Sequence, residues 1–120
     1  VTAQFVEKTN ELLQQNFPGV RHIIFGHLGD GNLHYNVGAP DGQEEDFLSI
    51  QKDVYKVVYD SVHAFKGSIS AEHGVGQLKK DLLPEYKDEV ELALMRKIKR
   101  ALDPNALLNP GKVINSVEFY

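Results

Sequence analysis

The stretch Arg21–Val37, RHIIFGHLGDGNLHYNV, determines the fold predicted for this chain. Residues Arg21–Leu28 and Asn32–Val37 are rich in β-branched and aromatic side chains, a composition typical of strands. The dipeptide Asp30-Gly31 between them is a strong signal for a two-residue turn of type I′. The sequence therefore predicts a β-hairpin, whose two strands are antiparallel.

A two-residue loop also sets the register of the hairpin, and it places Leu28 opposite Leu33 and His27 opposite His34. Opposed residues on one face have Cβ atoms about 4.5–5.5 Å apart, so the two imidazoles are predicted neighbours. Alternation assigns the side chains to two faces. The apolar face, which we expect to pack on helices, contains Ile24, Leu28, Leu33, Tyr35 and Val37, and the polar face contains His27, His34 and Asn36.

Helices are predicted on both sides of the hairpin in sequence. The first begins with Thr2 as its N-cap and continues to Asn16, before the turn signal Phe17–Val20. The second runs from about Glu44 to Phe65. Its apolar residues recur at steps of three and four, which indicates a core-facing stripe; they are Phe47, Ile50, Val54, Val58, Val62 and Phe65.

The remainder of the chain is predicted to contain a short strand, Ser68–Ala71, and a last helix from about Pro84 to Leu102. The helix is expected to bury Val90, Leu94, Ile98 and Ala101, and Asp103-Pro104 ends it. The whole chain, residues 1–120, is thus predicted to be one α+β domain. In it, a small antiparallel sheet carries helices packed on one face.

Composition excludes several classes of protein. The 120 residues carry a formal net charge of −4, and Lys and Arg do not gather into a nucleic-acid surface. No apolar run reaches the ~20 residues that cross a bilayer, so we expect a cytoplasmic protein, or one peripheral to a membrane. There is no cysteine, so a metal must be held by His, Asp or Glu. The chain begins at Val1 with a helical pattern, which suggests a piece of a longer protein or a processed chain.

Two interpretations of the paired histidines are open. They are either incidental side chains of a solvated hairpin, or two nitrogen ligands of one divalent ion, which needs a carboxylate as a third ligand. The segment Ser70–Gly76, SAEHGVG, offers that carboxylate in Glu72. His73 is adjacent, and in an extended backbone the two side chains point in opposite directions. The alternative is a surface loop.

Other polar residues are left outside the candidate site. His22 begins a strand and is predicted to be exposed, and His63 is predicted at the edge of the long helix's apolar stripe. Asp30 is explained by the turn, which favours Asp-Gly.

Three motifs in this order, GHLGDGNLH, SAEHGVG and LDPNALLNPGK, resemble the C-terminal part of FAD-dependent D-2-hydroxyacid dehydrogenases of the vanillyl-alcohol-oxidase type. That family includes D-lactate dehydrogenases, D-2-hydroxyglutarate dehydrogenases and the glycolate oxidase D subunit. The resemblance extends from Ile23 to Val113. It implies the C-terminal part of a substrate and metal domain, in a protein that oxidises a D-2-hydroxyacid to the 2-oxoacid and passes the hydride to FAD.

The resemblance also implies roles for individual residues. His27, His34 and Glu72 correspond to ligands of a divalent metal such as zinc or manganese. Asn36 corresponds to a residue of the substrate pocket, and His73 to the catalytic base. The segment from Asn109 to Lys112 corresponds to a piece that returns towards the flavin, so these two residues are expected contacts of the cofactor.

One departure from the family is large, because nothing in these 120 residues resembles an FAD-binding domain. We therefore expect the chain alone to hold most of the metal site, to bind no FAD, to be inactive and to self-associate through an exposed surface. In the full-length protein its partners are an N-terminal FAD domain, the hydroxyacid and an electron acceptor. The alternative function is a small metal-binding or protein-interaction module without redox activity.

Overall fold

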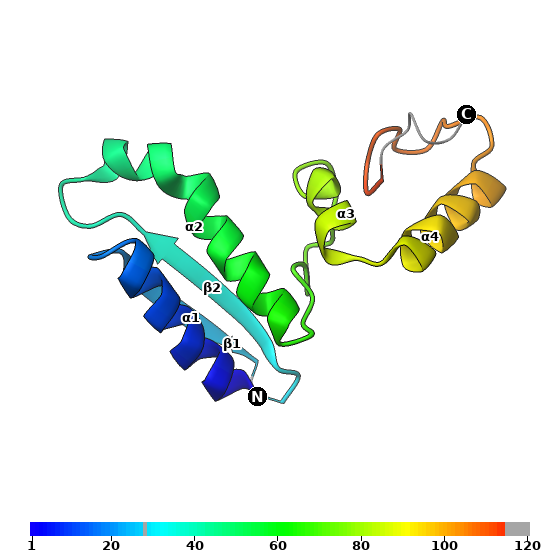
Figure 1. Cartoon of the computed structure of the whole chain (residues 1–120). Coiled ribbons are helices and arrows are strands. Elements are labelled where there is room, and N and C mark those ends of the chain that lie inside the picture. The colour runs from blue at the N-terminus through cyan, green and yellow to red at the C-terminus, as the bar shows by residue number, and fades with distance from the viewer. Residues whose placement is uncertain (28, 115–120) are drawn as a thin grey trace. The chain divides into compact units, whose positions relative to one another are not determined.

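The computed structural model describes residues 1–27 and 29–114, which contain one β-hairpin and several helices (Figure 1). By contacts between Cα atoms the chain divides into two compact units, Val1–Ala71 and a second that begins at Glu72, and each is described by itself. The elements are, in chain order, α1 (Thr2–Asn16), β1 (Arg21–His27), β2 (Asn32–Gly38), α2 (Glu44–Ala64), a 3₁₀ turn (Lys80–Leu82), α3 (Leu83–Tyr86) and α4 (Glu89–Leu102). The predicted α+β class is confirmed.

In the first unit, α1 and α2 run along the β1–β2 hairpin and cover one of its faces (Figure 1). Both helices are amphipathic, and their apolar stripes meet the apolar face of β2 at Val37 and Tyr35. The predicted stripe of α2 is confirmed, with Phe47, Val54 and Val58 buried. The buried core of this unit consists of Leu13, Val20, Val37, Phe47, Val54 and Val58.

The α1–α2 contact also contains a buried polar pair. The hydroxyl oxygens of Thr9 and Ser61 lie 2.6 Å apart, so each buried hydroxyl has a hydrogen-bond partner. The N-terminus of α1 differs slightly from the prediction, because the N-cap position is Val1 and no side chain caps the helix. Thr2 is instead the first helical residue.

The register of the hairpin differs from the predicted one by two residues. β1 and β2 are antiparallel, but His27 pairs with Asn32 and His34 pairs with Phe25. The connection is longer than a two-residue turn, and the backbone N–H of Asp30 donates to the carbonyl of His27 at 3.2 Å. Because the shift is an even number of residues, every described side chain keeps its predicted face. The predicted position of Leu28 lies outside the described residues.

Gly26 explains how the two strands approach at this end of the hairpin. A Cβ atom added there would overlap the carbonyl oxygen of Asn32 and lie 2.9 Å from the Cα of Leu33. Only a residue without a side chain fits such a close backbone approach. Gly26 therefore permits the close approach of the two strands next to the last pair of the ladder, His27 with Asn32.

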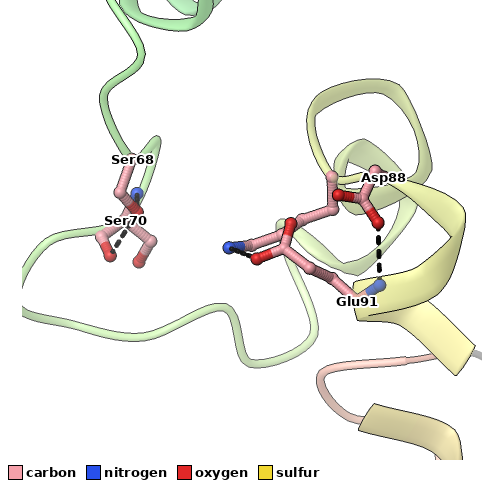
Figure 2. A network of polar contacts seen from close by, with 5 residues as sticks. Ser68, Ser70, Asp88 and Glu91 are labelled. Carbon is pink, nitrogen blue, oxygen red and sulfur yellow. Dashed lines mark hydrogen bonds and ion pairs between the residues drawn. The ribbon is translucent and has the colours of Figure 1, made fainter. Parts of the chain in front are cut away.

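The predicted strand Ser68–Ala71 is wrong, since the structure has bends and irregular backbone over these residues. The Ser68 hydroxyl donates to the carbonyl of Ser70 at 3.1 Å and accepts from its backbone N–H at 3.3 Å (Figure 2). Such local side-chain hydrogen bonds compete with the pairing of a strand.

In the second unit, the predicted helix Pro84–Leu102 is two helices, α3 and α4. Lys87 between them has extended dihedrals, with φ −118° and ψ 145°. The Asp88 carboxylate then accepts from the backbone N–H of Glu91 at 2.9 Å and caps α4 (Figure 2). An acidic N-cap followed three residues later by Glu is a start signal for a helix, and it explains the break.

The burial predicted for α4 is also wrong. Val90, Leu94 and Ile98 are 71%, 52% and 60% exposed, and Ala101 is exposed as well. Leu92 instead packs with Leu83 and Ile114, and Met95 lies against them. The apolar face predicted as core is thus a surface stripe of the helix, and a different face forms the small core. Among the described residues, no helix is both long and apolar enough to span a membrane.

Candidate functional site

The candidate site residues of the first unit lie on the hairpin face that the helices leave uncovered. His34 and Asn36 of β2 share this face with His27 of β1, as predicted. The two histidines are not directly opposed, because each faces a different partner. They are diagonal neighbours, a relation that separates Cα atoms by about 7–8 Å and is still within reach of ring side chains.

The imidazole of His34 has a defined neighbour on the opposite strand. Phe25 stacks on it with ring centroids 4.7 Å apart and an angle of 4° between the ring planes. Ring nitrogens point outward in the plane of an imidazole, so the phenyl ring occupies a face of the His34 ring and not its nitrogen edges. Phe25 itself is 55% exposed, so its position is not explained by the core.

The opposite face of β2 is anchored by a polar cluster directly behind this site. The Asn10 side-chain oxygen lies 2.7 Å from Nδ1 of His22 and 2.5 Å from the hydroxyl of Tyr35, which donates to it. Because an amide oxygen only accepts, His22 donates from Nδ1, and its Nε2 is a buried acceptor without a hydrogen-bond partner. The cluster ties α1 to both strands.

Burial changes the protonation of this cluster. Desolvation lowers the pKa of the His22 imidazole below its ordinary value and raises the pKa of the Tyr35 hydroxyl to about 12. Both groups are therefore uncharged at neutral pH. The prediction that His22 is exposed is wrong, because an even-numbered residue of β1 faces the helices. His63 is exposed on α2.

Residues 67–71 lead from α2 to the second part of the candidate site. Ala71 lines a hollow of about 510 Å³ in the first unit. The same hollow is lined by Asn32 and Leu33 at the start of β2. Glu72 and His73 are the next two residues of the chain after Ala71.

An extended backbone would point the side chains of Glu72 and His73 in opposite directions, but the structure differs from this prediction. Both lie in a bend and are exposed, and a carboxylate oxygen of Glu72 lies within 4.8 Å of a ring nitrogen of His73. The backbone that follows has left-handed dihedrals at Gly74 and Gly76, with φ 70° and 57°. Glycine adopts such dihedrals without strain, which lets the chain turn directly after the two side chains.

The segment from Asn109 to Lys112 is a tight turn supported by a residue that sequence reasoning did not identify. The Lys99 ammonium group of α4 donates to the carbonyl of Asn109 at 3.3 Å and to that of Lys112 at 2.7 Å. Asn109 has a positive φ of 48°. Lysines in the last turn of a helix often donate to nearby carbonyls. The position of Lys99 in the sequence was therefore the signal that could have predicted these hydrogen bonds.

A second support of this segment is Asp103, whose buried side chain ends α4. Its two carboxylate oxygens accept from the backbone N–H groups of Leu107 and Leu108 at 2.9 and 2.8 Å. The backbone N–H of Val113 then donates to the carbonyl of Gly76 at 2.6 Å. The C-terminal segment is therefore tied to the glycines that follow His73.

Comparison with known proteins identifies the family. The profile described as "FAD linked oxidases, C-terminal domain" matches residues 2–113. The chain is 45% identical over 113 residues to a D-2-hydroxyglutarate dehydrogenase of Xanthomonas citri pv. viticola, which covers 93% of the chain and 24% of that protein. It is 43% identical over 98 residues to a mitochondrial D-2-hydroxyglutarate dehydrogenase of Bos taurus, covering 81% of the chain and 17% of the relative.

A D-lactate dehydrogenase of Anaerostipes hadrus is also similar, with 42% identity over 89 residues, which are 74% of the chain and 19% of the relative. The chain spans about a quarter of the length of its bacterial D-2-hydroxyglutarate dehydrogenase relatives. The match to the family runs through the hairpin, the Glu72-His73 bend and the turn after α4. This chain belongs to the family of FAD-linked oxidase C-terminal domains.

Proposed function

We propose that this chain is part of the substrate and metal domain of an FAD-dependent dehydrogenase that oxidises a D-2-hydroxyacid to the 2-oxoacid. The observation that carries the proposal is the uncovered hairpin face, on which His27, His34 and Asn36 lie together while the other face forms the core. Relatives named as D-2-hydroxyglutarate and D-lactate dehydrogenases support the substrate class. The protein is proposed to be cytoplasmic or peripheral to a membrane.

The donor groups suit a divalent metal. Two imidazoles from His27 and His34 and a carboxylate from Glu72 form a set of nitrogen and oxygen ligands, which zinc and manganese accept. Such a set leaves coordination positions for substrate oxygens.

The chain's own residues have separate tasks in this proposal. His73 accepts the proton of the substrate hydroxyl at a ring nitrogen, a task suited to a neutral imidazole. Asn36, exposed beside His34, donates a hydrogen bond from its amide to a substrate oxygen. When bound, the metal would supply a Lewis acid for the substrate oxygens, and the flavin would supply the acceptor for the hydride.

The turn from Asn109 to Lys112 is proposed to meet the flavin in the full-length protein. Lys99 donates hydrogen bonds to two carbonyls of the turn, so the backbone of the turn is stabilised without a bound cofactor. Lys112 also donates from its ammonium group to the carbonyl of Pro110 at 3.4 Å. This arrangement leaves the exposed Asn109 side chain as the more available contact.

The catalytic role is tested in the full-length protein with His73→Ala. We expect flavin and metal content to stay at the wild-type level, while the rate of 2-oxoacid formation from D-2-hydroxyglutarate or D-lactate falls about 10²–10⁴-fold, as on loss of a general base. His63→Ala, which removes an exposed histidine of α2, is the matched control. A wild-type rate in the His73 variant contradicts the assignment.

The metal site is tested in the 120-residue chain by titration with Zn²⁺ and Mn²⁺. We expect weak binding that is lost in His27→Ala and in His34→Ala, with His63→Ala unchanged. Binding that survives both substitutions contradicts the shared site. Metal binding in a full-length protein that carries no flavin would instead favour the metal-binding module.

A further inference from the structure

We infer that Phe25 is a positioning residue for His34, and that its ring fixes the plane of the imidazole so that a ring nitrogen faces a divalent metal. The inference rests on the proposed function, because it concerns one ligand of the proposed metal site. It goes further in assigning a role to an aromatic side chain that neither binds metal nor belongs to the core.

The first argument is the placement of the pair. Phe25 of β1 lies directly opposite His34 of β2 in the ladder. Their side chains share the uncovered face, and their rings are almost parallel, at 4° and 4.7 Å between centroids. A centroid separation of this size is within the range of attractive aromatic pairs. One face of the imidazole is therefore occupied by carbon, while its nitrogen edges remain free of the phenyl ring.

The second argument is the cost of placing Phe25 there. Phe25 is 55% exposed, so it buries much less apolar surface on folding than a core phenylalanine does. The same face carries the polar side chains of Asn32 and Asn36 and the exposed apolar side chain of Ile23. A large exposed aromatic residue between these groups is better explained by the ring it contacts than by packing.

The third argument concerns the metal-bound state. An imidazole that coordinates a divalent cation carries more positive charge than a free one, and a phenyl face attracts positive charge. Stacking therefore favours the ligated form as well as restricting rotation of the ring. A ligand whose orientation is restricted before binding loses less conformational freedom on coordination.

The backbone around the pair supports the same role. Tyr35, the residue after His34, points to the other face, where its hydroxyl donates a hydrogen bond to the Asn10 side chain. Gly26, the residue after Phe25, keeps the strands close. Both residues of the stacked pair therefore sit on backbone whose position is determined by their neighbours.

The test compares Phe25→Leu, which keeps an apolar β-strand side chain but removes the aromatic face, with Phe25→Tyr, which keeps that face. Ile23→Ala is the matched control. Ile23 lies on the same strand and the same face, opposite Asn36, and is 63% exposed. All variants are made in the 120-residue chain, and circular dichroism verifies that each retains the helical content of the wild type.

The first readout is the NMR spectrum of the metal-free chain. The ring protons of His34 should be shifted upfield by the phenyl ring in the wild type and in Phe25→Tyr. The shift should disappear in Phe25→Leu and persist in Ile23→Ala. Ring signals of His34 that are the same in wild type and Phe25→Leu overturn the inference without reference to any metal.

The second readout is the affinity for Zn²⁺, measured by titration. The strength of aromatic pairs corresponds to an affinity about two- to tenfold weaker in Phe25→Leu, with Phe25→Tyr and Ile23→Ala at the wild-type value. Equal affinities in Phe25→Leu and wild type overturn the positioning role. His34→Ala separates the two proposals: if it binds Zn²⁺ as the wild type does, the proposed metal site fails, whatever the NMR result for Phe25.

Discussion

Both compact units of this chain contain helices whose sequences predict an apolar face. Only the first unit buries the faces that were predicted. In α2, Val54 and Val58 are buried against α1 and the hairpin. In α4, Val90, Leu94 and Ile98 repeat at the same spacing of four residues, but all three are largely exposed. Periodicity therefore identifies an apolar face, whereas burial depends on whether a second apolar surface is available to meet it.

The largest effect is expected from Gly26→Ala, which attacks the feature that only the first unit has, the close strand pair. The added Cβ overlaps backbone of Asn32, so the ladder must open, and the free energy of unfolding should fall by about 3 kcal/mol or more. Urea unfolding followed by circular dichroism measures it. Gly38→Ala is the control, since nothing lies within 4 Å of a Cβ there. A Gly26 variant as stable as the control contradicts the observed strand approach.

Next in size is a pair of identical substitutions, one in each unit. Leu13 is fully buried, so Leu13→Ala should lower the free energy of unfolding by about 2–5 kcal/mol. Leu94 is 52% exposed, and Leu94→Ala should cost less than about 1 kcal/mol. Chemical denaturation of both variants compares them directly. Similar losses for the two would mean that the exposed face of α4 is covered in solution.

Asp103→Ala examines what stabilises the second unit in place of a large core. The buried carboxylate accepts hydrogen bonds from two backbone N–H groups, and the substitution removes both hydrogen bonds. Hydrogen bonds to a charged group contribute about 1.5–3 kcal/mol, so we expect a loss of about 2 kcal/mol. Amide hydrogen exchange should show faster exchange at Leu107 and Leu108. Unchanged exchange at these two amides would exclude this role, and Asp81→Ala, at an exposed site, is the control.

The smallest effect is a pH dependence in the first unit. Burial lowers the pKa of His22 in the folded state, so the unfolded chain takes up a proton first as the pH falls through 6.5. The free energy of unfolding is therefore constant with respect to this group above that pH, and it decreases towards the lowered folded pKa. Stability measured from pH 8 to 5 should depend less on pH in His22→Gln than in the wild type. His63→Gln should keep the wild-type dependence, and an identical slope in all three proteins excludes His22 as the cause.

Much of the candidate site follows from local patterns. The hairpin residues and the alternation of side chains place His27, His34 and Asn36 on one face, and this holds even though the predicted register is wrong. The error arises because the Asp-Gly signal favours a two-residue turn, while the ladder ends earlier, at His27 and Asn32. A shift by two residues preserves faces but changes partners, so His34 meets Phe25 instead of His27.

Other parts of the site depend on contacts between residues far apart in sequence. No pattern indicates that Asn10 of α1 bonds His22 and Tyr35 behind the site, because this requires α1 to lie across both strands. The bend at Glu72 and His73 was predicted as extended backbone after a strand, and the local hydrogen bonds of Ser68 with Ser70 remove that strand. Lys99 supports the Asn109–Lys112 turn only because α4 and the turn fold back on each other.

Local patterns were enough to predict the α+β class, the hairpin, the apolar stripe of α2 and the family, because composition, periodicity and ordered motifs are local properties of the chain. The contacts of the folded chain were needed to establish which apolar faces are buried, which residue stacks on His34 and how His22 is protonated. Burial, ring stacking and desolvation each need a second surface, and the sequence of one segment does not specify which other segment supplies it.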